Sequence, residues 1–255
     1  MDFLRGLVKP EWESVLLVLL AMLGFRLLSD WLHVAVRKAR KYSEEDATVA
    51  VYRIVGCIHH TIQVPLALYI LAQPQFRQDR VGAHSAASRA LLVISSGYFI
   101  HDFFHALSHL DVQGWGYVIH GIGCTAVYGI SLVMGDVTRA PRFHFYGAGF
   151  MLWELSSYFL HFRWFMFKHN TSKRLQLYNG LALIASYLLC RLVWGFYLSY
   201  LFVQDSKSLD LAPAYLYMMW GANVALNSLN VFWFSLIIKK AIDTLSGRHS
   251  FGKRD

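Results

Sequence analysis

The chain has 255 residues, of which 56% are apolar and 16% are charged, whereas soluble domains carry about a quarter charged residues. Its formal net charge is +8. This composition excludes a disordered chain, a coiled coil and a disulfide-rich scaffold, and it is unusual for a soluble enzyme. It predicts an all-α polytopic membrane protein, because about seven spans of about 20 residues would account for most of the apolar residues.

Seven apolar segments follow one another along the chain, separated by charged residues and turn formers. In chain order the predicted spans are Val15–Ala35, Val49–Ala72, Ala90–Leu110, Trp115–Met134, Phe143–Phe167, Leu177–Phe202 and Pro213–Ile238. The second, third, fifth and sixth spans carry polar residues in their middle, so we expect them to face the interior of a helical bundle. The first span is apolar enough that we expect it to face lipid. Residues 1–46 are therefore predicted to form an N-terminal membrane helix and a basic linker.

Lys and Arg are more numerous in the loops on the side of the C-terminus, where Arg37, Lys168 and Lys240 lie. The positive-inside rule then predicts a cytosolic C-terminus and a lumenal N-terminus. The basic balance indicates anionic lipid headgroups as partners and not nucleic acid. Three cysteines fall far apart within predicted spans, and we expect free thiols and no disulfide.

Ionisable side chains within the predicted spans are costly to bury and tend to mark function. In the third span, His101, His105 and His109 are spaced i, i+4 and i+8 and share one helical face, and Asp102 is adjacent to them. His120 follows in the fourth span, after a short loop. The third and fourth spans therefore form an antiparallel hairpin that carries four histidines.

Metal chemistry is one interpretation of these histidines. His101-x-x-x-His105 resembles the first histidine box of membrane di-iron oxygenases, but the H-x-x-H-H boxes that such sites also need are absent from the sequence. A single zinc ion on His101, His105 and His120 is the other metal arrangement that the spacing allows. We expect no metal.

Acyl transfer is a second interpretation, because a histidine in a water-poor cavity can act as a general base or a nucleophile. Asp102 or Glu154 would fix the tautomer of the imidazole. The alternative is that the buried groups only pair with one another between helices, for example Glu154 with Arg191. That alternative is favoured for any one histidine, but it is weaker for the whole set across three adjacent spans.

Six stretches resemble the TLC domain family, the membrane domain shared by ceramide synthases, translocating-chain-associating membrane proteins and small TLC-domain proteins. The stretches are HHTIQVPLALYIL (59–71), SSGYFIHDFFHAL (95–107), GYVIHGIGCTAVYGISLVMGD (116–136), LWELSSYFLHFRWFMF (152–167), NGLALIASYLLCRLVWGF (179–196) and LNVFWFSLIIKKA (229–241). The resemblance implies a six-helix TLC core within residues 47–241, a short cytosolic tail at 242–255, and residence in the endoplasmic reticulum.

In ceramide synthases the matching site is a His-His pair followed in the next span by an H-D-x-x-D pattern. Here the pair becomes His120-Gly121, and the H-D-x-x-D region becomes the stretch from Trp153 to Tyr158, with Glu154 at the first acidic position. The resemblance implies that His120 accepts the acyl group or moves a proton, with Glu154 and Arg191 around it. We expect His101 or His105 to supply the missing second imidazole.

Two functions are therefore predicted: transfer of a fatty acyl group from acyl-CoA to an amine or hydroxyl of a lipid, or non-catalytic lipid binding, sensing or trafficking. The predicted catalytic side chains are His120, His101, His105, Asp102 and Glu154. The predicted cavity side chains are Arg191, Trp153, Tyr98, Ser157, Tyr158 and Asn227. Membrane lipids would be the partners and acyl-CoA the co-substrate, with no permanently bound cofactor.

Overall fold

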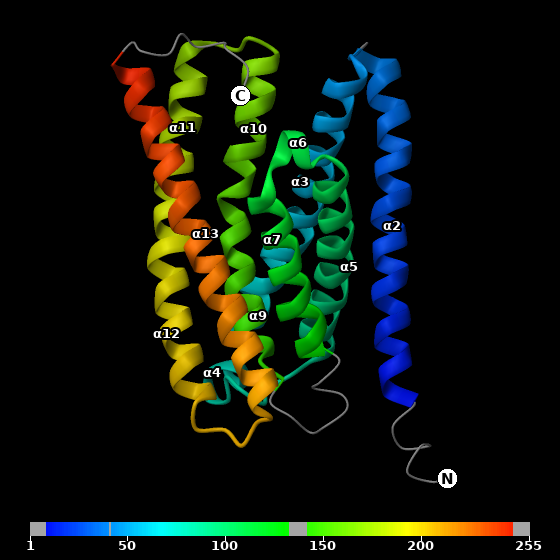
Figure 1. Cartoon of the computed structure of the whole chain (residues 1–255), viewed down its shortest axis with the longest axis vertical. Helices are drawn as coiled ribbons and strands as arrows, with labels where there is room; N and C mark the ends of the chain where they lie inside the picture. Colours follow the sequence, from blue (N-terminus) through cyan, green and yellow to red (C-terminus); the bar gives the residue numbers. More distant parts are fainter. Residues whose placement is uncertain (1–8, 41, 133–141, 247–255) are drawn as a thin grey trace.

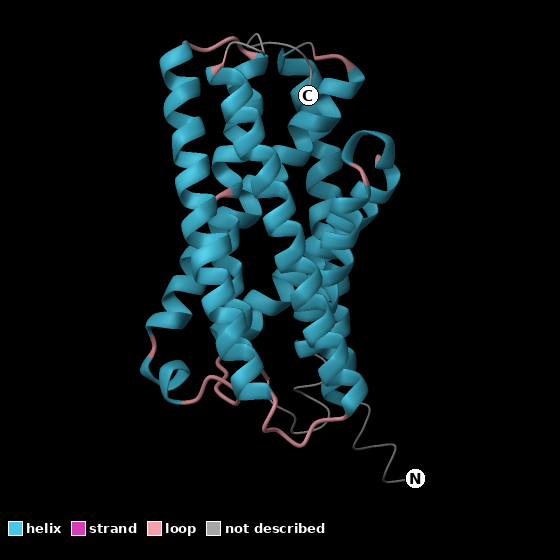
Figure 2. Ribbon diagram, turned by 60° about the vertical axis from the view of Figure 1, so that its left-hand side comes forward, coloured by secondary structure: helices cyan, strands magenta, loops and turns pink. Residues whose placement is uncertain are grey.

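The computed structural model describes residues 9–40, 42–132 and 142–246, and all regular secondary structure in these residues is helical (Figure 2). The predicted end of the fourth span at Met134 and most of the predicted C-terminal tail lie outside the described residues. The helices in chain order are α2 (Lys9–Arg40), α3 (Glu44–Ala72), α4 (Pro74–Gln78), α5 (Ala86–Ser108), α6 (Leu110–Gln113), α7 (Trp115–Thr125), η1 (Ala126–Ile130), α9 (His144–Met151), η2 (Leu152–Leu155), α10 (Ser157–Lys168), α11 (Lys173–Tyr187), η3 (Leu188–Trp194), α12 (Gly195–Ser206) and α13 (Pro213–Leu245).

Local sequence explains where the long helices begin. Ser43 precedes α3 and its side chain accepts a hydrogen bond from the backbone N–H of Asp46. Ser85 and Ser88 form a reciprocal capping box at the start of α5. Such caps satisfy backbone donors that the first helical turn leaves unpaired. Pro213 opens α13, where its missing N–H costs no helical hydrogen bond.

Five helical segments are long and apolar enough to cross a membrane. They are Trp12–Ala39, Glu44–Ala72, Ala86–Ser108, Lys173–Ser206 and Pro213–Thr244. This confirms the prediction of a polytopic helical membrane protein. The predicted fourth and fifth spans consist of shorter pieces, α7 with η1 and α9 with η2 and α10, because a 3-10 turn divides the fifth span and the described part of the fourth ends at Leu132.

The helix α2 lies on the outside of the bundle, where Figure 1 shows it beside α5 at one edge. Only 11% of its most apolar window is buried, against 56% of the window in α5. Its exposed leucines therefore suit contact with lipid. The two helices approach closely at Gly97, where an added Cβ would lie 2.6 Å from the Cβ of Ala21, so this position requires a glycine.

The interior of the bundle is built from α3, α5, α7 and α9, with α12 and α13 closing the other side (Figure 1). Aromatic side chains fill much of this core, including the fully buried Tyr146. Cys57, Cys124 and Cys190 are free thiols, as predicted.

Candidate functional site

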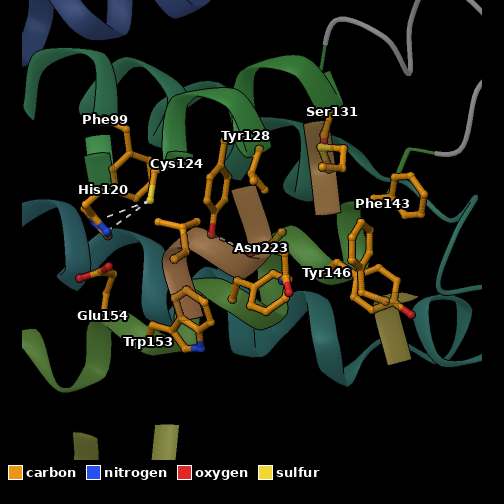
Figure 3. Close-up of a pocket in the computed structure, with 16 residues that line it drawn as sticks. Phe99, His120, Cys124, Tyr128, Ser131, Phe143, Tyr146, Trp153, Glu154 and Asn223 are labelled. Atoms are coloured by element: carbon orange, nitrogen blue, oxygen red, sulfur yellow. Dashed lines mark hydrogen bonds between the residues drawn. The ribbon is translucent and has the colours of Figure 1, made fainter. Parts of the chain in front are cut away.

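A pocket lies inside the bundle between α5, α7, η1, α9 and the helices α12 and α13 (Figure 3). Its wall is mostly aromatic and aliphatic, with Phe99, Tyr128 and Phe150 among the lining side chains. His120 and Glu154 stand together at one end. The free cavity is about 30 Å³, which holds about two water molecules. A lipid chain therefore enters only when wall side chains move.

At the other end of the pocket, Tyr146 joins a polar cluster with Arg80 and Asp205. Asp205 accepts two hydrogen bonds from Arg80, at 2.7 Å from Nε and 2.9 Å from Nη2. The hydroxyl of Tyr146, which lines the pocket, also donates to Asp205. The hydrogen bonds with Asp205 and Tyr146 hold the pKa of Arg80, in the loop after α4, above its ordinary value.

Glu154 and Arg191 form a buried ion pair, with 3.4 Å between Glu154 Oε2 and Arg191 Nη2. Arg191 also donates to Ser156 Oγ at 2.9 Å, to Ser157 Oγ at 2.9 Å and to Asn230 Oδ1 at 3.0 Å. Ser157 in turn donates to Glu154 Oε2 at 2.7 Å. A buried pair offsets its desolvation only when further hydrogen bonds satisfy both charges, and these serines and Asn230 meet that condition.

Two imidazoles approach the carboxylate of Glu154. Nε2 of His60 lies 3.6 Å from Glu154 Oε2. Figure 3 shows His120 directed toward the same carboxylate, and its Nε2 is 3.6 Å from the Sγ of Cys124. The ring of His120 also packs edge-on against Phe99, with 5.9 Å between ring centroids. His120 is therefore held by packing, with one edge facing the carboxylate.

The structure brings together several side chains that the sequence predicted for the site. Trp153 lines the pocket beside Glu154, and Arg191 and Ser157 bind that carboxylate. Asn227 lies behind the wall, where its amide donates to Ser199 Oγ at 2.9 Å.

Two further predicted side chains lie next to the site but outside the pocket lining. Tyr98 stacks on His59, with 3.8 Å between ring centroids. Tyr158 donates a hydrogen bond to Thr61 at 3.1 Å on the outer side of α3.

His101 and His105 do not reach His120, contrary to the expectation that the third span supplies a second imidazole. His101 Nε2 lies 3.0 Å from Ser29 Oγ of α2, and His105 stacks on Tyr52 with 4.8 Å between centroids. The reason is helical geometry, because these histidines lie on a different face of α5 from the one that packs on α7.

The face of α5 that packs on α7 carries Phe99 and Phe103. Phe99 lines the pocket, and the backbone of Phe103 lies against Gly121. Asp102 is 3% exposed, and its Oδ1 has no hydrogen-bond partner among the described residues. It also lies outside the pocket lining. Of the predicted catalytic side chains, His120 and Glu154 are the two that meet there.

Sequence patterns did not single out His60 and His161 as site residues. Their rings stack with 5.5 Å between centroids, and His60 lies beside Glu154. An added Cβ at Gly56 would lie 2.7 Å from Nε2 of His161, so the glycine makes room for this stack. The adjacent His59 and His60 in an apolar segment were the available signal.

The described residues contain no group of three His, Cys, Asp or Glu side chains arranged to hold a metal ion. The zinc arrangement allowed by the spacing would require His101, His105 and His120 to converge. The contacts of His101 and His105 with α2 and α3 place them elsewhere.

Comparison with known proteins identifies the family. The family model described as the TLC domain matches residues 51–239. An uncharacterized TLC domain-containing protein of Schizosaccharomyces pombe is 28% identical over 188 residues, which cover 72% of this chain and 62% of the relative. Topoisomerase I damage affected protein 4 of Saccharomyces cerevisiae is 29% identical over 58% of this chain and 53% of the relative.

TLC domain-containing protein 2 of Danio rerio is 24% identical over 65% of each chain. The chain thus spans just under two thirds of the length of the fission-yeast and zebrafish relatives, and about half of the budding-yeast protein. The family model covers most of the chain, including every residue of the His120–Glu154–Arg191 site. The chain therefore belongs to the TLC domain family of multi-pass membrane proteins.

Proposed function

We propose that this protein takes a fatty acyl chain into its internal pocket and transfers the acyl group from acyl-CoA to an amine or hydroxyl of a membrane lipid. The observation that carries this proposal is the form of the pocket. Its wall is apolar and aromatic, and a histidine and a carboxylate stand together at one end. An acyl chain matches such a wall, and its reactive carbonyl would lie at the polar end.

In this proposal His120 acts as the general base. The acceptor amine or hydroxyl attacks the thioester carbonyl carbon while its proton passes to the imidazole of His120. The carbon–sulfur bond then breaks, and the proton leaves with the CoA thiolate as a thiol. Glu154 orients the imidazole, while Arg191 and the hydroxyl of Ser157 hold the carboxylate in place.

The proposal includes seven spans in the endoplasmic reticulum membrane, with a lumenal N-terminus and a cytosolic C-terminus. The consecutive helical segments α7–η1 and α9–η2–α10 would be the remaining two of the seven spans, because both run along the bundle among the longer helices (Figure 1). The end of the bundle that carries the α10–α11 connection is rich in exposed lysines, including Lys38, Lys173 and Lys239. If this end is cytosolic, its lysines would attract the phosphates of acyl-CoA.

A second candidate function is non-catalytic lipid binding or sensing, or a trafficking role. The observation that favours it is the completeness of the Arg191 network, in which the guanidinium already has four oxygen partners. The cavity of about 30 Å³ also requires movement before any chain is bound. In this case His120 would stabilise the pocket and would not react.

A transfer assay separates the two candidates. Full-length protein in lipid nanodiscs is incubated with isotope-labelled oleoyl-CoA and a lipid extract, and labelled lipid products are identified by mass spectrometry. We expect the wild type to form a labelled lipid and His120→Gln to lose this activity. The matched control is His169→Gln at the end of α10, where the exposed imidazole hydrogen-bonds to the hydroxyl of Tyr42. Saturable oleoyl-CoA binding with no labelled lipid product would favour the non-catalytic candidate.

A further inference from the structure

A second groove lies on the outer side of the bundle between α3 and α10, away from the pocket. It has a volume of about 330 Å³, and its apolar lining includes Ile54, Ile58 and Ile62 of α3 and Phe162 and Phe165 of α10. From Ile54 to Ile62 the groove follows α3 for about 12 Å, at about 1.5 Å per residue. This is less than half of the hydrocarbon core of about 30 Å, so the groove fits part of one acyl chain.

Arg53 stands at the end of this groove that lies nearer the start of α3. It is one turn before Cys57, which lines the groove, and positions i and i+4 share a helical face. Its Nη1 donates to the backbone carbonyl of Leu160 in α10 at 3.4 Å, and its guanidinium carbon lies 5.6 Å from the ring centroid of Trp164. The arginine therefore bridges the two helices that form the groove.

Among the residues that the structure describes, Arg53 has no carboxylate as a counter-ion. Its Nε is buried and has no hydrogen-bond partner among the described residues. The ion pairs found in the described part of the chain do not include Arg53. An uncompensated cation within a membrane span is costly, so the position calls for an anion from outside the chain.

The depth of Arg53 suits a lipid headgroup. It lies about 13 Å along α3 from Glu44, by the helical rise. The helix has 29 residues, which exceeds the about 20 that span the hydrocarbon core. With this excess shared between the two ends of α3, Arg53 lies about 7 Å inside the core boundary, a depth from which a long basic side chain reaches toward the headgroups. Exposed Lys38 and Lys173 at the same end of the bundle add an attraction for anionic lipid.

We propose that Arg53 binds the phosphate of an anionic phospholipid and that one acyl chain of this lipid lies in the groove between α3 and α10. The phosphate supplies the missing counter-ion, and the isoleucines and phenylalanines cover the first part of the chain. The site is separate from the His120–Glu154 pocket and does not depend on any reaction there.

The test is lipid binding to the full-length protein by native mass spectrometry, with phosphatidylglycerol as the probe and phosphatidylcholine as the zwitterionic comparison. We expect Arg53→Gln to weaken phosphatidylglycerol binding by about tenfold, or about 1.4 kcal/mol, since it removes a charge-assisted hydrogen bond. Arg53→Lys keeps the charge and should recover part of the affinity. Arg163→Gln is the matched control, because Arg163 is on α10 but packs over Phe167.

The groove is tested by Ile58→Trp, which fills it and should weaken phosphatidylglycerol binding without removing Arg53. Inorganic phosphate distinguishes a lipid from a free anion, and at millimolar concentration it should not displace the lipid. Thermal unfolding of each variant confirms that it is folded, and Ile58→Trp carries the test if Arg53→Gln is unstable. Equal binding by wild type and by folded Arg53→Gln or folded Ile58→Trp, equal losses in Arg53→Gln and Arg163→Gln, or displacement by inorganic phosphate would each overturn the proposal.

Discussion

Glu154 and Arg191 meet, at 3.4 Å, where both of their helices depart from α-helical geometry. Glu154 is in the 3-10 turn η2 and Arg191 is in the π-helical segment η3. Such irregular turns are often found at functional sites because they redirect side chains. Here they place two charges from segments 37 positions apart against each other. The same carboxylate faces His60 and His120, so the pair organises the polar end of the pocket.

The first prediction concerns the stability of this pair. Glu154→Gln leaves the charge of Arg191 buried without its partner, and we expect a loss of about 3–5 kcal/mol in the free energy of unfolding. The double variant Glu154→Leu with Arg191→Met removes both charges and should be less destabilised than the single variant. Unfolding of the purified proteins in one detergent, followed by circular dichroism, gives the comparison.

The control for this measurement is the pair Arg37–Glu44 at the connection between α2 and α3, whose side chains are 46% and 65% exposed. Glu44→Gln should change the free energy of unfolding by about 0–1 kcal/mol. If Glu154→Gln were as mild as Glu44→Gln, the buried network would not have the role assigned to it.

The second prediction concerns the room beside the stacked His60 and His161. Gly56→Ala places a methyl group 2.7 Å from Nε2 of His161, so the imidazole or the helices must shift. We expect a loss of about 1–3 kcal/mol in the free energy of unfolding, as for other overpacked cores. Gly24→Ala is the matched control, because nothing lies within 4 Å of its new methyl group. Equal stability of the two variants would contradict a close approach of His161 to Gly56.

The third prediction concerns the topology. Glycosylation acceptor tags are added to each terminus in turn, and the protein is expressed in cells and treated with endoglycosidase. Seven spans with a cytosolic C-terminus predict a modified N-terminal tag and an unmodified C-terminal tag. The same modification state at both termini would mean an even number of spans and would contradict the proposal.

Much of the fold follows from sequence patterns. Long apolar segments with few charges form helices in a membrane, because a helix satisfies all of its backbone hydrogen bonds internally. The segments Glu44–Ala72 and Pro213–Thr244 are clear examples, since each contains a predicted span and extends it by five or six residues at one end. The fifth predicted span is harder. Its apolar stretch is continuous in sequence, yet the helix changes to a 3-10 turn at Leu152, and hydropathy carries no information on such a change.

The candidate site was predictable only in part. His120, Glu154 and Arg191 stand out as ionisable groups in apolar spans, and the structure brings Glu154 to both of the others. The prediction that His101 and His105 lie in the same cavity was wrong. Periodicity shows which residues share a helical face, but it does not show which neighbouring helix that face contacts. The face of His101 meets Ser29 of α2, and the helical register between spans decides this contact.

The most direct test of the central claim is to locate a bound acyl chain. Full-length protein in nanodiscs is incubated with an oleoyl-CoA analogue that carries a photoreactive diazirine in its chain, and crosslinked residues are mapped by peptide mass spectrometry. The account predicts crosslinks at pocket side chains such as Tyr128, Phe150 and Leu226, which unlabelled oleoyl-CoA abolishes. Crosslinks confined to the outer surfaces of α2 and α13, unchanged by unlabelled oleoyl-CoA, would contradict it.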